Sequence, residues 1–229
     1  MKRILTFGLA VMISIAAVAQ KNVTQFMGIP IDGTKSAMIQ KLKAKGFKYN
    51  ANADELSGEF NGEKVNISVV TNKNKVYRII VTDAVGSTEG NIRVNFNRLC
   101  RQFAKNDKYV PQNLVGEYEI GDDEDIYYEM NAHNKRYQAA YYQISEADKD
   151  TTGLTQWVVE KAMEEYTEAE IQRLTEQEVQ RMKIALLMFY MNEKVSHKSV
   201  WFMITERFGR YYIHIFYDNV LNQANGEDL

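Results

Sequence analysis

The first patterned stretch of the chain runs from Phe26 to Phe47 and predicts a short extended entry followed by one helix. Thr34 stands where an N-cap is needed, because its hydroxyl can accept an amide proton of the first helical turn. Gly46 suits the left-handed position just beyond the helix end. The apolar stripe at helical spacing consists of Met38, Ile39 and Leu42. We therefore expect a helix that docks on a sheet.

Alternation of apolar and polar residues then predicts a three-stranded antiparallel meander. Its first two strands, Leu56–Phe60 and Val65–Val70, flank Asn61-Gly62, a dipeptide typical of two-residue hairpin turns. The third strand is expected from Val76 to Thr82. Because the alternation has period two, one face of this sheet should be buried and the other exposed to solvent.

A second helix is expected from about Glu89 to Lys105, with Ser87 as its cap. Its core-facing stripe recurs at i, i+4, i+7 and i+11 and consists of Ile92, Phe96, Leu99 and Phe103. Cys100 lies beside this stripe, so we expect a small buried side chain. A nucleophilic pair of Cys100 with a histidine is the alternative.

The helical periodicity of apolar residues ends before Tyr109-Val110-Pro111, which we take as a boundary between two units. An acidic turn is expected at Asp122–Asp125, and Ile126–Met130 is expected to pair with Arg136–Ile144. The strands expected in the second unit are Val115–Ile120, Ile126–Met130, Arg136–Ile144, Val200–Thr205 and Tyr211–Asp218.

Residues 154–192 predict one long helix or two consecutive helices. Thr167–Glu170 and Thr175–Glu178 each match the capping box, in which a hydroxyl and a carboxylate bond backbone amides reciprocally. The stripe that we expect to be buried consists of Ile171, Leu174, Met182, Leu186 and Phe189.

Together these elements predict an α+β protein of antiparallel β-meanders packed against helices, either as two similar α/β subdomains or as one continuous sheet. The expected division is a first α-β-β-β-α unit over residues 20–110 and a second β/α unit with a C-terminal hairpin over residues 111–229. Val65–Asp83 and Val200–Asp218 share a pattern, which suggests an internal duplication.

Residues 1–19 have the composition of a signal peptide, with a basic start, an apolar run and a small-x-small cleavage pattern ending at Ala19. We therefore expect an exported, periplasmic or secreted protein with no membrane span. Without Lys2 and Arg3, 26 basic residues face 30 acidic ones, and such a balance argues against nucleic acid as a partner. The single cysteine excludes an intramolecular disulfide.

The sequence contains none of the common catalytic or nucleotide-binding motifs. His133, His197 and His214 are too widely spaced for a local metal site, and Asp122–Asp125 lacks the spacing of a calcium loop, so a solvated turn is the preferred interpretation. We expect no catalytic residues, no metal and no cofactor.

An excess of aromatic residues in the second half is the strongest functional signal. If Val200 and Ile213 face the core, neighbouring side chains on the same strands point to the opposite face. Either the helical region 154–192 covers that face, or the face is partly exposed and binds a glycan or a protein. The candidate binding residues are Trp201, Tyr212, His214 and Phe216, joined by Tyr142 and Tyr127 if the register allows.

Three stretches of the chain, the segment 26–47, the turn at Gly58–Gly62 and the ending from Tyr211, resemble an uncharacterised family of secreted proteins from Bacteroides-type bacteria. The entry at Ile29 to Ser36, placed before a helix and a meander, is also loosely similar to the α/β units of β-lactamase inhibitor protein and of the SmpA/OmlA envelope lipoproteins. This chain has neither a lipidation cysteine nor the inhibitor's cysteine pairs. The resemblance implies an envelope or secreted α/β protein and assigns no activity.

These observations favour an exported, non-catalytic recognition or envelope-associated module that binds a protein or a glycan through an aromatic sheet face. The alternatives are a hydrolase of unfamiliar type that uses scattered Asp, Glu and His residues, and a purely structural envelope protein. An enzyme would place carboxylates or a His–nucleophile pair in a concave pocket, whereas a binding module would present a shallow aromatic patch.

Overall fold

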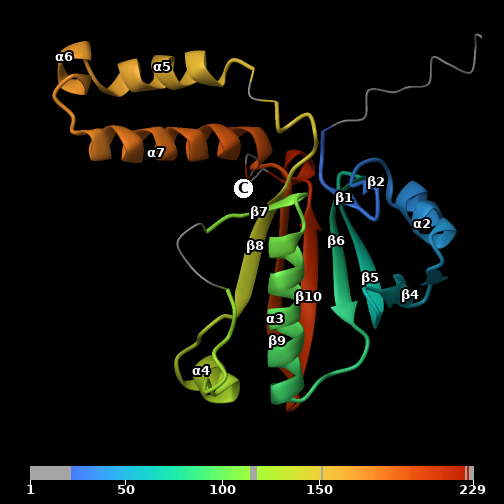
Figure 1. Ribbon diagram of the computed structural model, residues 1–229. Helices are drawn as coiled ribbons and strands as arrows, with labels where there is room; N and C mark the ends of the chain where they lie inside the picture. The colour runs from blue at the N-terminus through green and yellow to red at the C-terminus, as the bar shows by residue number, and fades with distance from the viewer. Residues whose placement is uncertain (1–21, 114–117, 151, 225, 227–229) are drawn as a thin grey trace, which may run out of the picture.

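An eight-stranded antiparallel sheet organises the computed structural model, which describes residues 22–113, 118–150, 152–224 and 226 (Figure 1). The strand order across this sheet is β3-β4-β5-β6-β10-β9-β8-β7. A separate two-stranded hairpin of β1 (Gln25–Phe26) and β2 (Ile29–Pro30) precedes it. The strands of the large sheet are β3 (Lys48–Asn50), β4 (Glu55–Phe60), β5 (Glu63–Asn72), β6 (Lys75–Asp83), β7 (Tyr109–Pro111), β8 (Gln138–Gln143), β9 (Ser199–Arg207) and β10 (Arg210–Asp218).

The helices divide into those that pack on the sheet and those that extend from it. Helices α2, α3 and α4 contribute buried side chains to the core of the sheet. Helices α5 and α7 pack on each other and project beyond the end of the sheet (Figure 1). The helices are α2 (Lys35–Ala44), α3 (Glu89–Lys105), α4 (Ile126–Ala132), α5 (Leu154–Glu165), α6 (Glu168–Ile171) and α7 (Glu176–Val195), followed by the 3-10 turn Val220–Asn222. The described part of the chain contains no helix with the length and hydrophobicity needed to cross a membrane. The predicted signal peptide, residues 1–19, lies outside the described residues.

The α+β prediction is confirmed, and the first helix forms as its caps indicate. The Thr34 hydroxyl accepts a hydrogen bond from the amide of Ala37 at 3.3 Å. Gly46 has a φ of +101°, and the amide of Phe47 bonds the carbonyl of Leu42 at 3.3 Å, which completes a Schellman end. The three stripe residues of α2 are buried, so this helix packs on the sheet as predicted.

The predicted meander is also present, as β4, β5 and β6. Asn61 and Gly62 have φ values of +53° and +80°, as a two-residue turn that matches the twist of its strands requires. The short strand β3, which the sequence did not indicate, extends the meander at the sheet edge. At the other side, β6 pairs with β10, so the β5–β6 and β9–β10 hairpins lie next to each other. Strands of both predicted units therefore share one sheet, while the duplication itself stays a prediction.

Helix α3 lies along β10 on the core face and has the predicted bounds (Figure 1). Its predicted stripe is buried, as is Cys100. The cap prediction was wrong, because Thr88 occupies the N-cap position and its side chain makes no capping bond. Ser87 instead pairs through its backbone with Tyr211, which ties the start of α3 to β10.

One strand prediction in the second unit, Ile126–Met130, was wrong, and a second, Val115–Ile120, was wrong in its described part. Residues 118–120 form no strand, and residues 114–117 lie outside the described residues. Ile126–Met130 belongs to α4 rather than to a hairpin, because the Asp125 carboxylate accepts the amide of Tyr128 at 2.8 Å and starts a helix there. Tyr127 and Tyr128 consequently lie on a helix surface. The strand β8 pairs with β7 and β9.

The predicted helical region forms two helices joined by a short third one. Both capping boxes are present, with Thr167 bonded to Glu170 and Thr175 bonded to Glu178. The expected burial of the stripe along this region was wrong. Four of its five residues are only half-buried and Phe189 is 48% exposed, because α7 packs on α5 alone along much of its length.

Candidate functional site

The outer face of the sheet is the face opposite the core-packed helices α2 and α3, and it carries most of the predicted binding residues. Along β9 and β10, alternate residues such as Val200, Phe202 and Ile213 are buried in the core, as predicted. Trp201 and Phe216 lie directly opposite each other in the β9–β10 register and point to the outer face. Both are half-buried, so this face is partly accessible to solvent.

A stacked aromatic pair lies at the centre of this face. The rings of Trp201 and Phe216 are nearly parallel, with centroids 3.9 Å apart and an interplanar angle of 11°. The guanidinium of Arg78, on β6, lies 5.2 Å from the Phe216 centroid and 5.7 Å from the Trp201 centroid. Stacking and cation–π attraction therefore hold the three side chains in one arrangement.

Asp218 fixes this arrangement through three hydrogen bonds. Arg78 donates to its two oxygens at 2.6 and 2.8 Å, and the Trp201 indole nitrogen donates to it at 3.0 Å. The carboxylate is buried, with 5% of its side chain exposed. Hydrogen bonding to Asp218 raises the pKa of Arg78, so the cation is permanent. A bidentate ion pair of this kind restricts both partners geometrically.

His214 extends the aromatic row along β10. Its Nδ1 lies 3.0 Å from the Thr82 hydroxyl, and its Nε2 lies 2.8 Å from the Thr205 hydroxyl. Its ring stacks loosely on Phe216, with centroids 6.3 Å apart. Burial lowers the pKa of His214, so the neutral ring is favoured. In the described part of the chain both ring nitrogens are engaged by hydroxyls, and no carboxylate orients the ring as in a catalytic triad.

The remaining candidates occupy different places. Tyr212 lies on the same face and packs against Gly86, where an added Cβ would stand 2.7 Å from the tyrosine ring. Tyr142 lies opposite Ser199 in the β8–β9 register, and therefore shares the face of Trp201 near its end. Tyr127 lies on α4 and is 55% exposed, so it does not belong to the outer face.

Arg78, Asp218, Thr82 and Thr205 belong to this site and were missed in the sequence. Arg78 and Asp218 are 140 residues apart and meet only because β6 pairs with β10. The alternation in β6 places Arg78 on the non-core face, but it does not reveal which strand lies beside it. A local pattern therefore could not have found this ion pair.

The other two histidines and the acidic turn, all within the described residues, show no comparable organisation. His133 lies 2.9 Å from Glu129 on the surface of α4, and His197 contacts the carbonyl of Asn22 at 2.7 Å. In the acidic turn, Glu124 bonds Lys135 and Tyr137, and Asp125 caps α4. Within the described residues no cluster of three or more His, Cys, Asp or Glu side chains could hold a metal ion.

No protein-family model, no curated protein and no solved structure matches this chain.

Proposed function

We propose that this protein is an exported recognition module that binds a protein partner through the outer face of its sheet. The observation that carries the proposal is the Trp201–Phe216 stack held beneath Arg78 by the buried Asp218 carboxylate. A few residues near the centre of a protein interface carry most of its binding energy, and tryptophan, tyrosine and arginine are enriched among them. A cluster that is ordered before binding loses less conformational entropy when the partner arrives.

The geometry favours a protein over a glycan as ligand. Trp201 and Phe216 already cover one flat ring face of each other, and Arg78 lies over both rings. Sugar rings need an open flat face for stacking, whereas protein side chains also pack against ring edges and against a guanidinium. A glycan ligand is the alternative outcome of the test below.

The first measurement tests access to the face. The chain has two tryptophans, and the substitution Trp157→Phe leaves Trp201 as the only one. We expect acrylamide to quench its fluorescence in the folded protein, because Trp201 is half-buried rather than fully enclosed. A shielded Trp201 would exclude the outer face as a binding surface.

The second measurement tests recognition itself. The immobilised protein is probed with a panel of defined oligosaccharides. It is also probed with purified envelope and secreted proteins of the organism that produces it. Phe216→Ala should weaken binding at least about tenfold, since interface hot spots cost about 1.4 kcal/mol or more on truncation. Val94→Ala, at a 61% exposed position on α3, is the matched control and should leave binding unchanged.

Three results would contradict the proposal. Equal loss of binding in both variants would indicate general destabilisation. Binding of oligosaccharides alone, sensitive to Phe216→Ala, would replace the protein ligand with a glycan. Absence of any ligand in both panels, with Trp201 accessible, would favour the purely structural role.

A further inference from the structure

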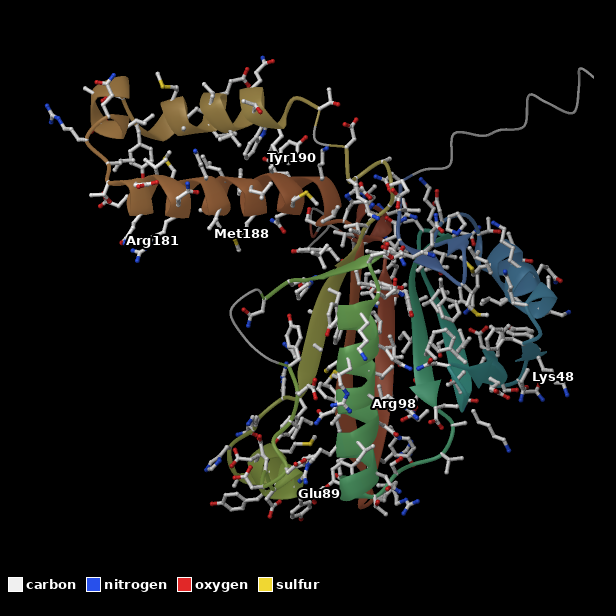
Figure 2. All side chains as sticks on the ribbon, viewed as in Figure 1. Lys48, Glu89, Arg98, Arg181, Met188 and Tyr190 are labelled. Carbon is white, nitrogen blue, oxygen red and sulfur yellow. The ribbon has the colours of Figure 1, made fainter. Side chains whose placement is uncertain are left out.

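The helical arm, formed by α5 and α7 (residues 154–165 and 176–195), exposes an apolar surface that no described part of the chain covers. Tyr190 of α7 packs on Trp157 of α5 with ring centroids 5.1 Å apart, so this side of α7 is paired. Met188 and Arg181 point away from α5, on the opposite side of α7 (Figure 2). Exposed large apolar side chains gather within six residues of α7: Ile184 (57%), Leu187 (42%), Met188 (40%) and Phe189 (48%).

The sequence of α7 indicates that this surface is normally covered. All eight residues from Ile184 to Met191 are apolar, so the helix is hydrophobic around its whole circumference at this level. A helix of this kind is buried in a soluble protein, yet α5 covers only one side of it. At its C-terminal end, α7 and the strands β7 and β8 enclose a groove of about 550 Å³. The walls of the groove are Val110, Pro111, Tyr142, Met188 and Phe189, with Ala185, Leu187, Met191 and Val195.

The spacing of the uncovered face matches a helix as its occupant. Gln177, Arg181, Ile184, Met188 and Met191 follow one another at alternating intervals of four and three residues. The apolar members of this series, Ile184, Met188 and Met191, fall at the seam positions of a coiled coil, in which each side chain inserts between residues of a facing helix.

We propose that the uncovered face of α7 is a dimer interface, in which α7 of a second copy of this chain packs antiparallel across a two-fold axis. In that register Ile184 lies against Met188 of the second copy. Arg181 lies against Met191 of the second copy at each end of the interface. Leu187 meets its own counterpart across the axis, as a symmetric interface requires.

The flanking charges permit this pairing. The same register brings Gln180 near Lys194 of the second copy and Glu178 near Asn192, so no like charges face each other at these positions. Residues 154–195 carry eight acidic and five basic side chains, a balance that opposes docking of the arm on an anionic membrane surface. A second copy therefore fits this face better than a lipid surface does.

The exposed area indicates a reversible dimer. Phe189 packs on Trp157 of α5, with ring centroids 5.7 Å apart, so Ile184, Leu187 and Met188 are the exposed side chains on the uncovered face. At about half of the roughly 150 Å² that a large side chain can bury, these three supply on the order of 200 Å² per copy. The groove walls add to this area, but the total over two copies stays below the roughly 1,200–2,000 Å² buried in stable complexes. We therefore expect association that depends on protein concentration.

The test is sedimentation velocity of the purified protein over about a hundredfold range of concentration. The wild-type protein should shift from monomer to dimer, and Met188→Glu should remain monomeric throughout. Val94→Glu, an exposed apolar position on α3, is the matched control and should dimerise like the wild type. A monomeric wild type, or a Met188→Glu dimer, would overturn the proposal.

A second variant tests the register. Leu187→Cys should form a disulfide between two copies under mild oxidation, and Val94→Cys should not. Equal cross-linking of both variants would indicate random collision and contradict the two-fold arrangement. Binding of phosphatidylglycerol vesicles by a strictly monomeric protein, abolished by Met188→Glu, would assign the face to a membrane instead. The inference is independent of the proposed ligand site, since Phe216→Ala should leave the dimer intact.

Discussion

The Lys198 ammonium donates to the Asp148 carboxylate in the interior of the protein, where their side chains are 2% and 3% exposed. Asn22 donates to the same carboxylate at 2.7 Å and accepts from Lys198 at 2.8 Å. Ser145 adds two further hydrogen bonds at 2.6 Å each. This network joins the first described residue to the segments before α5 and before β9.

Loss of one partner of this pair should destabilise the protein strongly. We expect Lys198→Met or Asp148→Asn to lower the free energy of unfolding by about 3–5 kcal/mol, because each leaves the other group buried and unpaired. The double variant Lys198→Met/Asp148→Leu should lose less than either single variant, because no buried charge remains. Urea unfolding measures all three, and single losses below about 1 kcal/mol would contradict the burial of the pair.

Acidification should weaken the same hydrogen-bond network, because it protonates Asp148. Burial alone would raise the pKa of Asp148, but hydrogen bonds from Lys198, Ser145 and Asn22 together lower it to about 2. An unfolded aspartate titrates near 3.9, so the unfolded chain binds the proton first. The stability contributed by Asp148 should be complete above about pH 4 and should disappear as the pH falls to about 2. Asp148→Asn should lack this component in urea titrations across that window, and an unchanged pH profile would refute the assignment.

His214 should make the fold sensitive to milder acid. Burial lowers its pKa below that of an unfolded histidine, about 6.5, so the unfolded state takes up the proton first as the pH falls. The free energy of unfolding should therefore decrease below about pH 6.5, until the folded state is also protonated. His214→Gln retains hydrogen-bonding groups for Thr82 and Thr205 and should flatten this slope. A slope that persists in His214→Gln would assign the dependence to another group.

Cys100 should be unreactive in the folded protein. Burial raises the pKa of its thiol to about 12, so almost no thiolate exists at neutral pH. We expect a disulfide reagent to label one thiol in denaturant and essentially none under native conditions. Rapid native labelling would show that the core opens around α3 and would revive the nucleophilic alternative.

Two glycines should respond to alanine in opposite directions. At Gly58, on β4, an added Cβ would lie 2.4 Å from the Phe47 ring, which is buried, so we expect a loss of about 1–3 kcal/mol. At Gly90, on α3, no atom lies within 4 Å of the added Cβ, and Gly90→Ala should gain about 0.5–1 kcal/mol from helix propensity. Thermal unfolding of the two variants measures both effects, and a neutral Gly58→Ala would show that Phe47 can move aside.

The sequence by itself determined the elements whose signals are local. Thr34, Gly46 and the Asn61-Gly62 turn specify their own backbone geometry, because caps and tight turns depend on a few neighbouring residues. The same holds for the burial of Val200, Phe202 and Ile213, which follows from alternation along one strand. Tyr127 shows where such local reasoning fails, because one aspartate cap outweighed the β-propensity of its aromatic neighbours.

Only the tertiary structure decided what meets across long distances in the chain. Pairing of β6 with β10 brings Arg78 to Asp218, and folding of the segment before α5 brings Asp148 to Lys198. Strand order depends on the summed packing of both sheet faces, so no local pattern encodes it. The helical arm shows the converse, because the apolar run in α7 is evident in the sequence, yet the described part of the chain leaves one face of this helix exposed.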